Sequence, residues 1–173
     1  MQFEFATATR IVFGPGKLRE AGSIVKSAGK RPLVVTGKNF KRAEPLFHLL
    51  YENKVECANF SISGEPKIQN IRDGVEFAMT ENCDWVIGIG GGSVLDAGKA
   101  IAAMMRNEGD VLDYLEIIGQ GKALKQSARF LAIPTTAGTG SEVTRNAVLA
   151  SPEHKLKVSL RSVHMLPGVA LVD

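Results

Sequence analysis

The sequence contains few of the residues that build disulfide frameworks or metal sites. Among 173 residues it has two cysteines and three histidines, and none of them stands in a metal-knuckle or His-x-x-x-His arrangement. Cys57 and Cys83 lie beside apolar runs, so we expect buried free thiols, which fit a reducing, cytoplasmic location. For His48, His154 and His164 we expect structural or solvated roles, and we predict no metal site in this chain.

Long apolar runs and a large charge excess are also missing. No stretch approaches the length of a transmembrane helix. The N-terminus lacks the basic start and apolar core of a signal peptide, so none is expected. The net charge of +3 is too small to favour nucleic acid or a membrane as a partner. The one tight basic group, Lys38, Lys41 and Arg42, is either the solvated start of a helix or a polyanion site.

The chain instead has the composition and alternation of an α/β domain. It is 45% hydrophobic and 23% charged, which is normal for a globular protein. Short apolar runs predict strands at 31–37, 55–62, 84–89, 129–133 and 169–172, and amphipathic stretches predict helices at 17–28, 43–53, 67–81 and 93–107. This alternation predicts one doubly wound domain over residues 1–173, with a parallel sheet and helices on both faces.

Two segments depart from the alternation. Residues 3–13 predict either a hairpin or an edge strand. Residues 146–150 and 156–160 flank a turn and predict a β-hairpin after the fourth strand of the sheet. Because Asp173 stands at the edge of a predicted strand, we expect that further chain follows in the parent protein.

The strongest chemical signal is a glycine run between a predicted strand and a predicted helix. Gly90, Gly91 and Gly92 permit close approach of the backbone to a ligand. Ser93 follows at the position where a helix N-cap is expected. Unpaired amides and the helix dipole at such a point suit a pyrophosphate.

Two charged residues lie in the first turns of the same predicted helix. Asp96 and Lys99 are three residues apart and so share one helix face, from which both can reach the same bound molecule. The pattern is neither Gly-x-Gly-x-x-Gly nor a phosphate-binding loop of the nucleotide-hydrolase type. A tight turn with an ordinary helix cap therefore remains the alternative interpretation.

A second polar loop follows another predicted strand. Residues 133–142 contain Thr135, Thr136, Thr139 and Ser141 among glycines, so the loop offers many donors and little bulk. Ligands of open α/β sheets bind outside the carboxyl ends of the strands. Two such loops favour a shared binding crevice over a pair of simple connectors.

A third candidate is the turn after the first strand of the sheet, with Gly37, Lys38 and Asn39. In dinucleotide folds this region meets the adenosine ribose, where an acidic residue binds the 2′-hydroxyl and repels a 2′-phosphate. The turn offers a glycine, a cation and an amide, so a phosphorylated ribose fits better than it would in an acidic site. An ordinary strand–helix turn is the alternative.

Together these loops resemble the iron-containing alcohol dehydrogenase family. Residues 90–99 are similar to its Gly-Gly-Gly-Ser-x-x-Asp-x-x-Lys motif, and residues 134–142 to its Pro-Thr-Thr-x-Gly-Thr-Gly-Ser-Glu motif. Smaller similarities lie at residues 13–16 and 166–173. The resemblance covers essentially the whole chain and implies a Rossmann-like nucleotide domain. It also implies that the family's C-terminal all-helical domain is absent from this chain.

The resemblance implies roles for individual residues. The loop from Gly90 to Ser93 would bind the pyrophosphate of the cofactor, with Asp96 near the nicotinamide and Lys99 near a ribose or a loop backbone. Thr135, Thr136 and Thr139 would line the adenosine and diphosphate side, with Ser141 nearby. Leu149 would pack in the crevice, and Lys157 or Lys155 would reach the nicotinamide ribose.

Two positions depart from the family pattern. Gly37 stands where NAD enzymes of the family often have Asp, which favours NADP as the cofactor, with NAD as the alternative. Gly98 stands where Ala is commoner, and an interior glycine should cost the helix about 1 kcal/mol.

The resemblance also implies a reaction. It is hydride transfer between an alcohol or aldehyde and the nicotinamide, assisted by Fe²⁺ or Zn²⁺ on one Asp and three His of the helical domain. We therefore expect this chain to bind nucleotide without turning over substrate. We also expect a homodimer formed through the N-terminal strands. The alternatives are a stand-alone nucleotide-binding module, or a relative of dehydroquinate synthase, glycerol dehydrogenase or maleylacetate reductase.

Overall fold

The computed structural model describes all residues from Met1 to Asp173. The strands are β1 (Arg10–Phe13), β2 (Pro32–Gly37), β3 (Ala58–Ile62), β4 (Trp85–Gly90), β5 (Phe130–Pro134), β6 (Asn146–Ser151), β7 (Leu156–Arg161) and β8 (Val169–Val172). The α-helices are α1 (Ala21–Ala28), α2 (Glu44–Glu52), α3 (Ile68–Thr80) and α4 (Gly92–Met104). Short 3-10 turns are η1 (Lys17–Glu20), η2 (Phe40–Arg42), η3 (Val111–Tyr114), η4 (Ser141–Val143) and η5 (Val163–Met165). None of the helices has the length and apolar character needed to cross a membrane.

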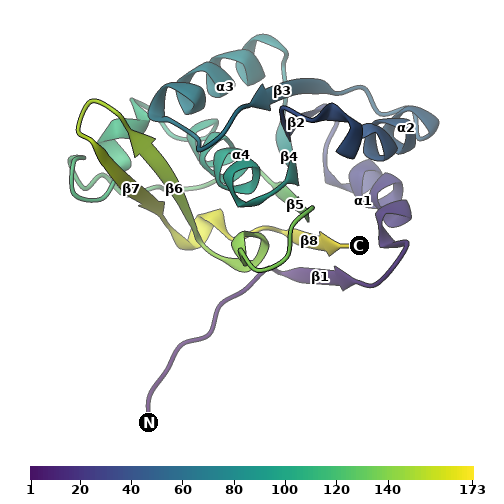
Figure 1. Ribbon diagram of the computed structural model, residues 1–173, viewed down its shortest axis with the longest axis horizontal. Coiled ribbons are helices and arrows are strands. Elements are labelled where there is room, and N and C mark those ends of the chain that lie inside the picture. The colour runs from purple at the N-terminus through teal and green to yellow at the C-terminus, as the bar shows by residue number, and fades with distance from the viewer.

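Six strands form one parallel sheet in the order β1-β8-β5-β4-β2-β3. The central strands β2 and β4 are buried along almost their whole length and, apart from Thr36, consist of apolar residues and glycine, because both faces of the sheet are covered. One apolar cluster joins the sheet to α1 and α2, and a second joins it to α3, α4 and the β6–β7 hairpin on the opposite face (Figure 1). The predicted doubly wound sheet with helices on both faces is confirmed.

The strand order reverses beside β2, and this reversal creates the crevice. The chain passes from β2 outward to β3 and then returns across β2 to β4. Thr36 of β2 pairs with Ile89 of β4, so the carboxyl ends of these strands, Gly37 and Gly90, lie side by side. Open α/β sheets bind their ligands at such a switch point.

At the other edge of the sheet, β1 pairs in parallel with β8. Of the two options for residues 3–13, the edge strand is therefore correct, and it is limited to four residues. The preceding segment extends away from the body of the molecule (Figure 1), and Phe3 and Phe5 are exposed. Next to this edge, the Asp173 carboxylate accepts hydrogen bonds from the amides of Gly16 and Leu18, both at 2.8 Å.

The predicted hairpin is present as the antiparallel pair β6 and β7. It lies outside the main sheet, against α4 (Figure 1). Ala147 and Leu149 of β6 are fully buried, whereas Val148 between them is 38% exposed. The hairpin therefore has one core face and one face turned towards the carboxyl-end crevice.

Gly98 explains how α4 packs so closely on the sheet. A Cβ at this position would lie 2.6 Å from Cε2 of Phe130, and a Cβ at Gly88 would lie 2.9 Å from Cζ of the same ring. The ring of Phe130 thus fills the space that two glycines leave between α4 and β4. The packing of the Phe130 ring on Gly88 and Gly98 offsets the helix-propensity cost expected for Gly98.

Candidate functional site

The two glycine-rich loops touch one another at the carboxyl ends of β4 and β5. A Cβ at Gly91 would lie 3.2 Å from Oγ1 of Thr136, and one at Gly92 would lie 3.1 Å from Cγ2 of Thr139. The amide of Thr135 donates to the Gly90 carbonyl at 2.9 Å. The structure therefore brings both predicted loops into one crevice, and the absence of side chains on the first loop allows the contact.

The amino end of helix α4 faces this crevice. The helix begins at Gly92, and extended Gly91 is its N-cap, with no side chain bonded to the first turn. The expected N-cap role of Ser93 is wrong, because the N-cap is Gly91, two residues earlier, and Ser93 lies within the first turn of the helix. Amides at the start of a helix have no acceptor inside the helix, so this end suits an anion.

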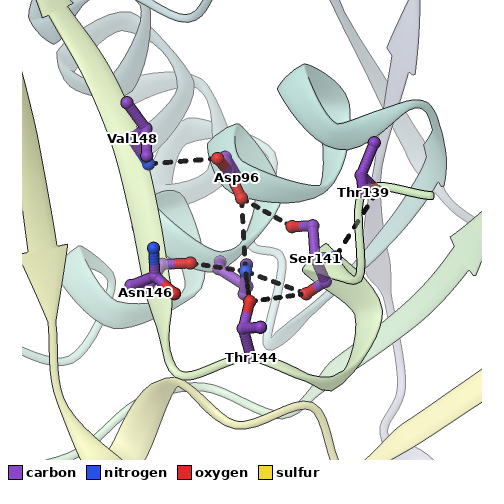
Figure 2. Close-up of polar contacts among 7 residues, drawn as sticks. Asp96, Thr139, Ser141, Thr144, Asn146 and Val148 are labelled. Atoms are coloured by element: carbon purple, nitrogen blue, oxygen red, sulfur yellow. Dashed lines mark hydrogen bonds and ion pairs between the residues drawn. The ribbon is translucent and has the colours of Figure 1, made fainter.

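Asp96 connects three elements at the floor of the crevice (Figure 2). Its Oδ1 atom accepts a hydrogen bond from Ser141 Oγ at 2.5 Å, and its Oδ2 atom accepts one from the Val148 amide at 3.0 Å. Lys99 Nζ lies 3.2 Å from Oδ1. One carboxylate thereby ties α4 to the second loop and to the hairpin strand β6.

Lys99 is fully buried below Asp96. Its ammonium donates to the Ser141 carbonyl at 2.9 Å, to Thr144 Oγ1 at 3.2 Å and to the Asn146 carbonyl. Burial lowers the pKa of Lys99 below its usual value, and the charge of Asp96 offsets part of that effect.

This arrangement corrects the expectation that Lys99 faces the bound molecule together with Asp96. An ammonium has three donor hydrogens, and the second loop together with the first residue of β6 provides three acceptors. Lys99 contacts backbone carbonyls of the loop instead, which was the second of the two positions expected for it.

A polar cavity of about 370 Å³ lies beside this network. Its walls come from the start of α4, the second loop, both hairpin strands and the segment before α3. It is lined by Glu65, Pro66, Gly92, Ser93, Asp96, Thr139, Ser141, Thr144, Asn146, Val148, Ala150 and Lys157. The volume and the convergent polar groups are those of a small-molecule site.

The placement of Leu149 in the crevice is wrong. Leu149 is fully buried among core residues, and its neighbours Val148 and Ala150 line the cavity instead. Successive side chains of a strand point to opposite faces, so the expectation was in error by one residue.

The two candidate lysines of the hairpin differ in position, and contact of either one with a nicotinamide ribose stays a prediction. Lys157 lines the cavity and pairs with the carboxylate of Glu65. Lys155 is exposed in the turn, with a positive φ of 52°, and it does not line the cavity.

Sequence reasoning missed the segment before α3. The Ala150 amide donates to the Pro66 carbonyl at 2.8 Å, and Lys67 forms an isolated parallel bridge with Ala150. These bonds hold Glu65 and Pro66 against the hairpin. No local motif marks this segment, because the hairpin that brings it to the cavity lies more than eighty positions later in the chain.

The turn after β2 lies outside this cavity. A Cβ at Gly37 would meet Val94 Cγ2 at 3.6 Å, which is an ordinary contact, so the position has room for a larger residue. Lys38 and Asn39 are exposed. They stay predictions as contacts of the adenosine ribose.

The chain offers no donor set for a metal ion. No group of three or more His, Cys, Asp or Glu side chains lies close enough together. His48 Nε2 lies 3.2 Å from Glu52, and His154 Nδ1 lies 2.8 Å from Ser151 Oγ. His164 is exposed. These residues do not fit the iron site that the family resemblance implies, whose ligands would have to lie outside these 173 residues.

Comparison with known proteins decides the family. The sequence pattern described as iron-containing alcohol dehydrogenase matches residues 8–173. The chain belongs to the iron-containing alcohol dehydrogenase family. A curated relative, the 1,3-propanediol dehydrogenase of Klebsiella pneumoniae, is 34% identical over 99% of this chain and 45% of its own length.

Solved structures of the family have the same fold. A crystal structure of a 1,3-propanediol oxidoreductase matches 100% of this chain and 46% of that chain, with a TM-score of 0.92 and 33% identity. The sulfoacetaldehyde reductase of Bifidobacterium kashiwanohense, crystallised with NAD⁺, covers 100% and 46% with a TM-score of 0.89 and 30% identity. The chain thus spans slightly less than half the length of these dehydrogenases and reductases. It corresponds to their N-terminal part.

Proposed function

We propose that this chain is the nicotinamide-dinucleotide-binding half of a metal-dependent alcohol dehydrogenase. The observation that carries the proposal is the uncapped start of α4, which opens beside a polar cavity at the switch point of the sheet. A helix end of this kind binds phosphate, and the adjoining cavity has room for the sugar and ring of a nucleotide.

The cofactor would lie across the carboxyl edge of the sheet. Its pyrophosphate would contact the amides that follow Gly91, because those amides have no acceptor inside the helix. Thr135 and Thr136, both exposed, would face the adenosine side. The nicotinamide ribose would enter the cavity beside Asp96 and Lys157.

The open turn at Gly37 supports NADP as the preferred form, with NAD as the second choice. No acidic side chain occurs in residues 36–43, and Lys38 is exposed next to Gly37. Calorimetric titration with NADPH and, separately, with NADH tests this preference. Tighter NADPH binding is expected, and a Gly37→Asp variant should weaken NADPH binding while sparing NADH. Tighter NADH binding by the unaltered chain would refute the cofactor preference while leaving the nucleotide site in place.

The whole dehydrogenase would transfer a hydride between an alcohol or aldehyde and the nicotinamide. A metal ion bound outside this chain would supply Lewis acidity at the substrate oxygen. The present residues would position the nicotinamide, which is the protein's main contribution in cofactor enzymes. Because they hold no metal-ligand set, we expect nucleotide binding without turnover. Fe²⁺-dependent reduction of NADP by this chain with simple alcohols would contradict that expectation.

We also propose that the chain forms homodimers through its N-terminal edge. Phe13 of edge strand β1 is 76% exposed, and Phe3 and Phe5 before it are exposed to a similar degree. Exposed apolar edge strands tend to pair with another chain. Sedimentation velocity over a wide concentration range tests this, and a monomer at every concentration would contradict it.

A further inference from the structure

One ion pair lines the cavity without touching the Asp96–Lys99 network. Glu65, from the segment before α3, pairs with Lys157 of β7. Both side chains are more than half exposed, so the pair itself contributes little to stability. It lies in the lining of the same cavity as Gly92, Ser93 and Asp96.

The position of Glu65 is fixed by backbone contacts. Gly64 before it has a φ of 72°, a conformation that favours glycine. The hydrogen bond from the Ala150 amide to Pro66 and the bridge between Lys67 and Ala150 come directly after it in the chain. These contacts fix the backbone on both sides of Glu65 next to the hairpin, within reach of Lys157, with which its carboxylate pairs.

The pair presents donors and acceptors side by side and carries no net charge. Lys157 keeps two of its three donor hydrogens, and Glu65 keeps most of its acceptor sites. A phosphate gains little from a neutral pair that includes a carboxylate. A vicinal diol, whose hydroxyls both donate and accept, matches it.

We propose that Glu65 is a specificity-determining residue of this cavity. Its carboxylate accepts hydrogen bonds from the hydroxyls of the second ribose of a nicotinamide dinucleotide, and it holds Lys157 beside the same ribose. This assignment rests on the proposed nucleotide site. It adds to that site a residue that discriminates the sugar of the nicotinamide half from a bare phosphate terminus.

Two probes that differ by this sugar test the assignment: ADP, which ends at the phosphate, and ADP-ribose, which carries the second ribose. Calorimetric titration should show that the unaltered chain binds ADP-ribose more tightly than ADP. Glu65→Ala should weaken ADP-ribose binding by about tenfold to a hundredfold, the range for a lost hydrogen bond to a charged group. ADP binding should be unchanged in that variant.

A matched control exists on the same hairpin strand. Glu116 pairs with Arg161 of β7 at 3.4 Å, with similar exposure, and neither residue lines the cavity. Glu116→Ala should leave binding of both probes unchanged. Glu65→Gln keeps an oxygen acceptor without the charge and should restore part of the ADP-ribose affinity.

The outcomes separate this inference from the proposed function. Equal affinity of the unaltered chain for ADP and ADP-ribose overturns the role of Glu65 and leaves the nucleotide site intact. Equal losses for both probes in Glu65→Ala overturn the role too, because the residue would then act on the site as a whole. Failure of the unaltered chain to bind either probe overturns the proposed function, and the inference with it.

Discussion

Replacing Lys99 with Met should expose how much of the site depends on one buried ammonium. Lys99 is fully buried, and its donors are bonded to the Ser141 and Asn146 carbonyls and to Thr144. Methionine has a similar volume, so the substitution removes the charge and the hydrogen bonds while leaving only a small cavity. Asp96 then loses its counter-charge, and buried carbonyls lose their donor.

The expected loss follows from general measurements. Breaking a buried ion pair by removing one partner costs about 3–5 kcal/mol. The Asp96 side chain is 17% exposed, so water can solvate part of its charge. We therefore expect a loss of about 3 kcal/mol in the free energy of unfolding. With a urea m-value of about 2 kcal/mol per molar, the unfolding midpoint should fall by about 1.5 M.

Urea unfolding followed by circular dichroism measures this loss, with Lys26→Met, at an exposed position of α1, as the control. The control should change stability by less than about 0.5 kcal/mol. Hydrogen exchange at the Val148 amide, which donates to Asp96, should accelerate in Lys99→Met. If that variant fails to fold, Thr144→Val, which removes a single acceptor, should cost about 1 kcal/mol. A Lys99→Met protein within about 1 kcal/mol of the unaltered chain, with unchanged exchange, would refute the argument.

Three further perturbations test other parts of the structure. Gly98→Ala should lower stability in thermal unfolding by up to about 2 kcal/mol. The added methyl group would overpack against Phe130 at a cost of about 1–3 kcal/mol, which exceeds the helix-propensity gain of about 1 kcal/mol. Adding Phe130→Leu to this variant should restore the lost stability. Hydrogen bonds from the Leu18 and Gly16 amides hold the pKa of the Asp173 carboxyl below its ordinary 3.8. The ionised carboxylate therefore stabilises the fold above pH 3.8, and this contribution is lost as the pH falls through the lowered pKa. Asp173→Asn should remove this part of the pH dependence of the unfolding midpoint. Burial raises the pKa of the Cys83 and Cys57 thiols. A disulfide reagent at neutral pH should therefore react with the native chain much more slowly than with the urea-unfolded chain. Equal reaction rates would contradict the expected burial of the thiols.

The parallel sheet could be predicted from the sequence because its strands are buried on both faces. Continuous apolar runs such as residues 33–35 and 85–87 fit such a strand and separate clearly from the amphipathic helices between them. The predicted bounds therefore fall within a few residues of those observed. The two glycine-rich loops could also be predicted from the sequence, because the close contact between them requires small residues.

The depth and orientation of single side chains could not be predicted in the same way. In β6, apolar residues occupy both faces, at Ala147 and Leu149 and again at Val148 and Ala150. Alternation alone does not say which face meets α4. For Lys99, helical spacing correctly placed it on the face of Asp96. How far residues 141–146 fold over that face is a tertiary property, and it decides whether the ammonium meets a ligand or the loop.

The charge balance of the site shows why the hairpin matters for recognition. Asp96 is neutralised by Lys99 from its own helix, and Glu65 by Lys157 from the hairpin. The cavity lining therefore carries no net charge from these groups, and attraction for phosphate is left to the amides at the start of α4. A strand–loop–helix unit alone would offer that phosphate site and no group to select the sugar attached to the phosphate. The hairpin and the Glu65 segment add a neutral, hydrogen-bonding wall, so discrimination between a dinucleotide and a simpler phosphate should depend on Glu65 and Lys157 rather than on the glycine loop.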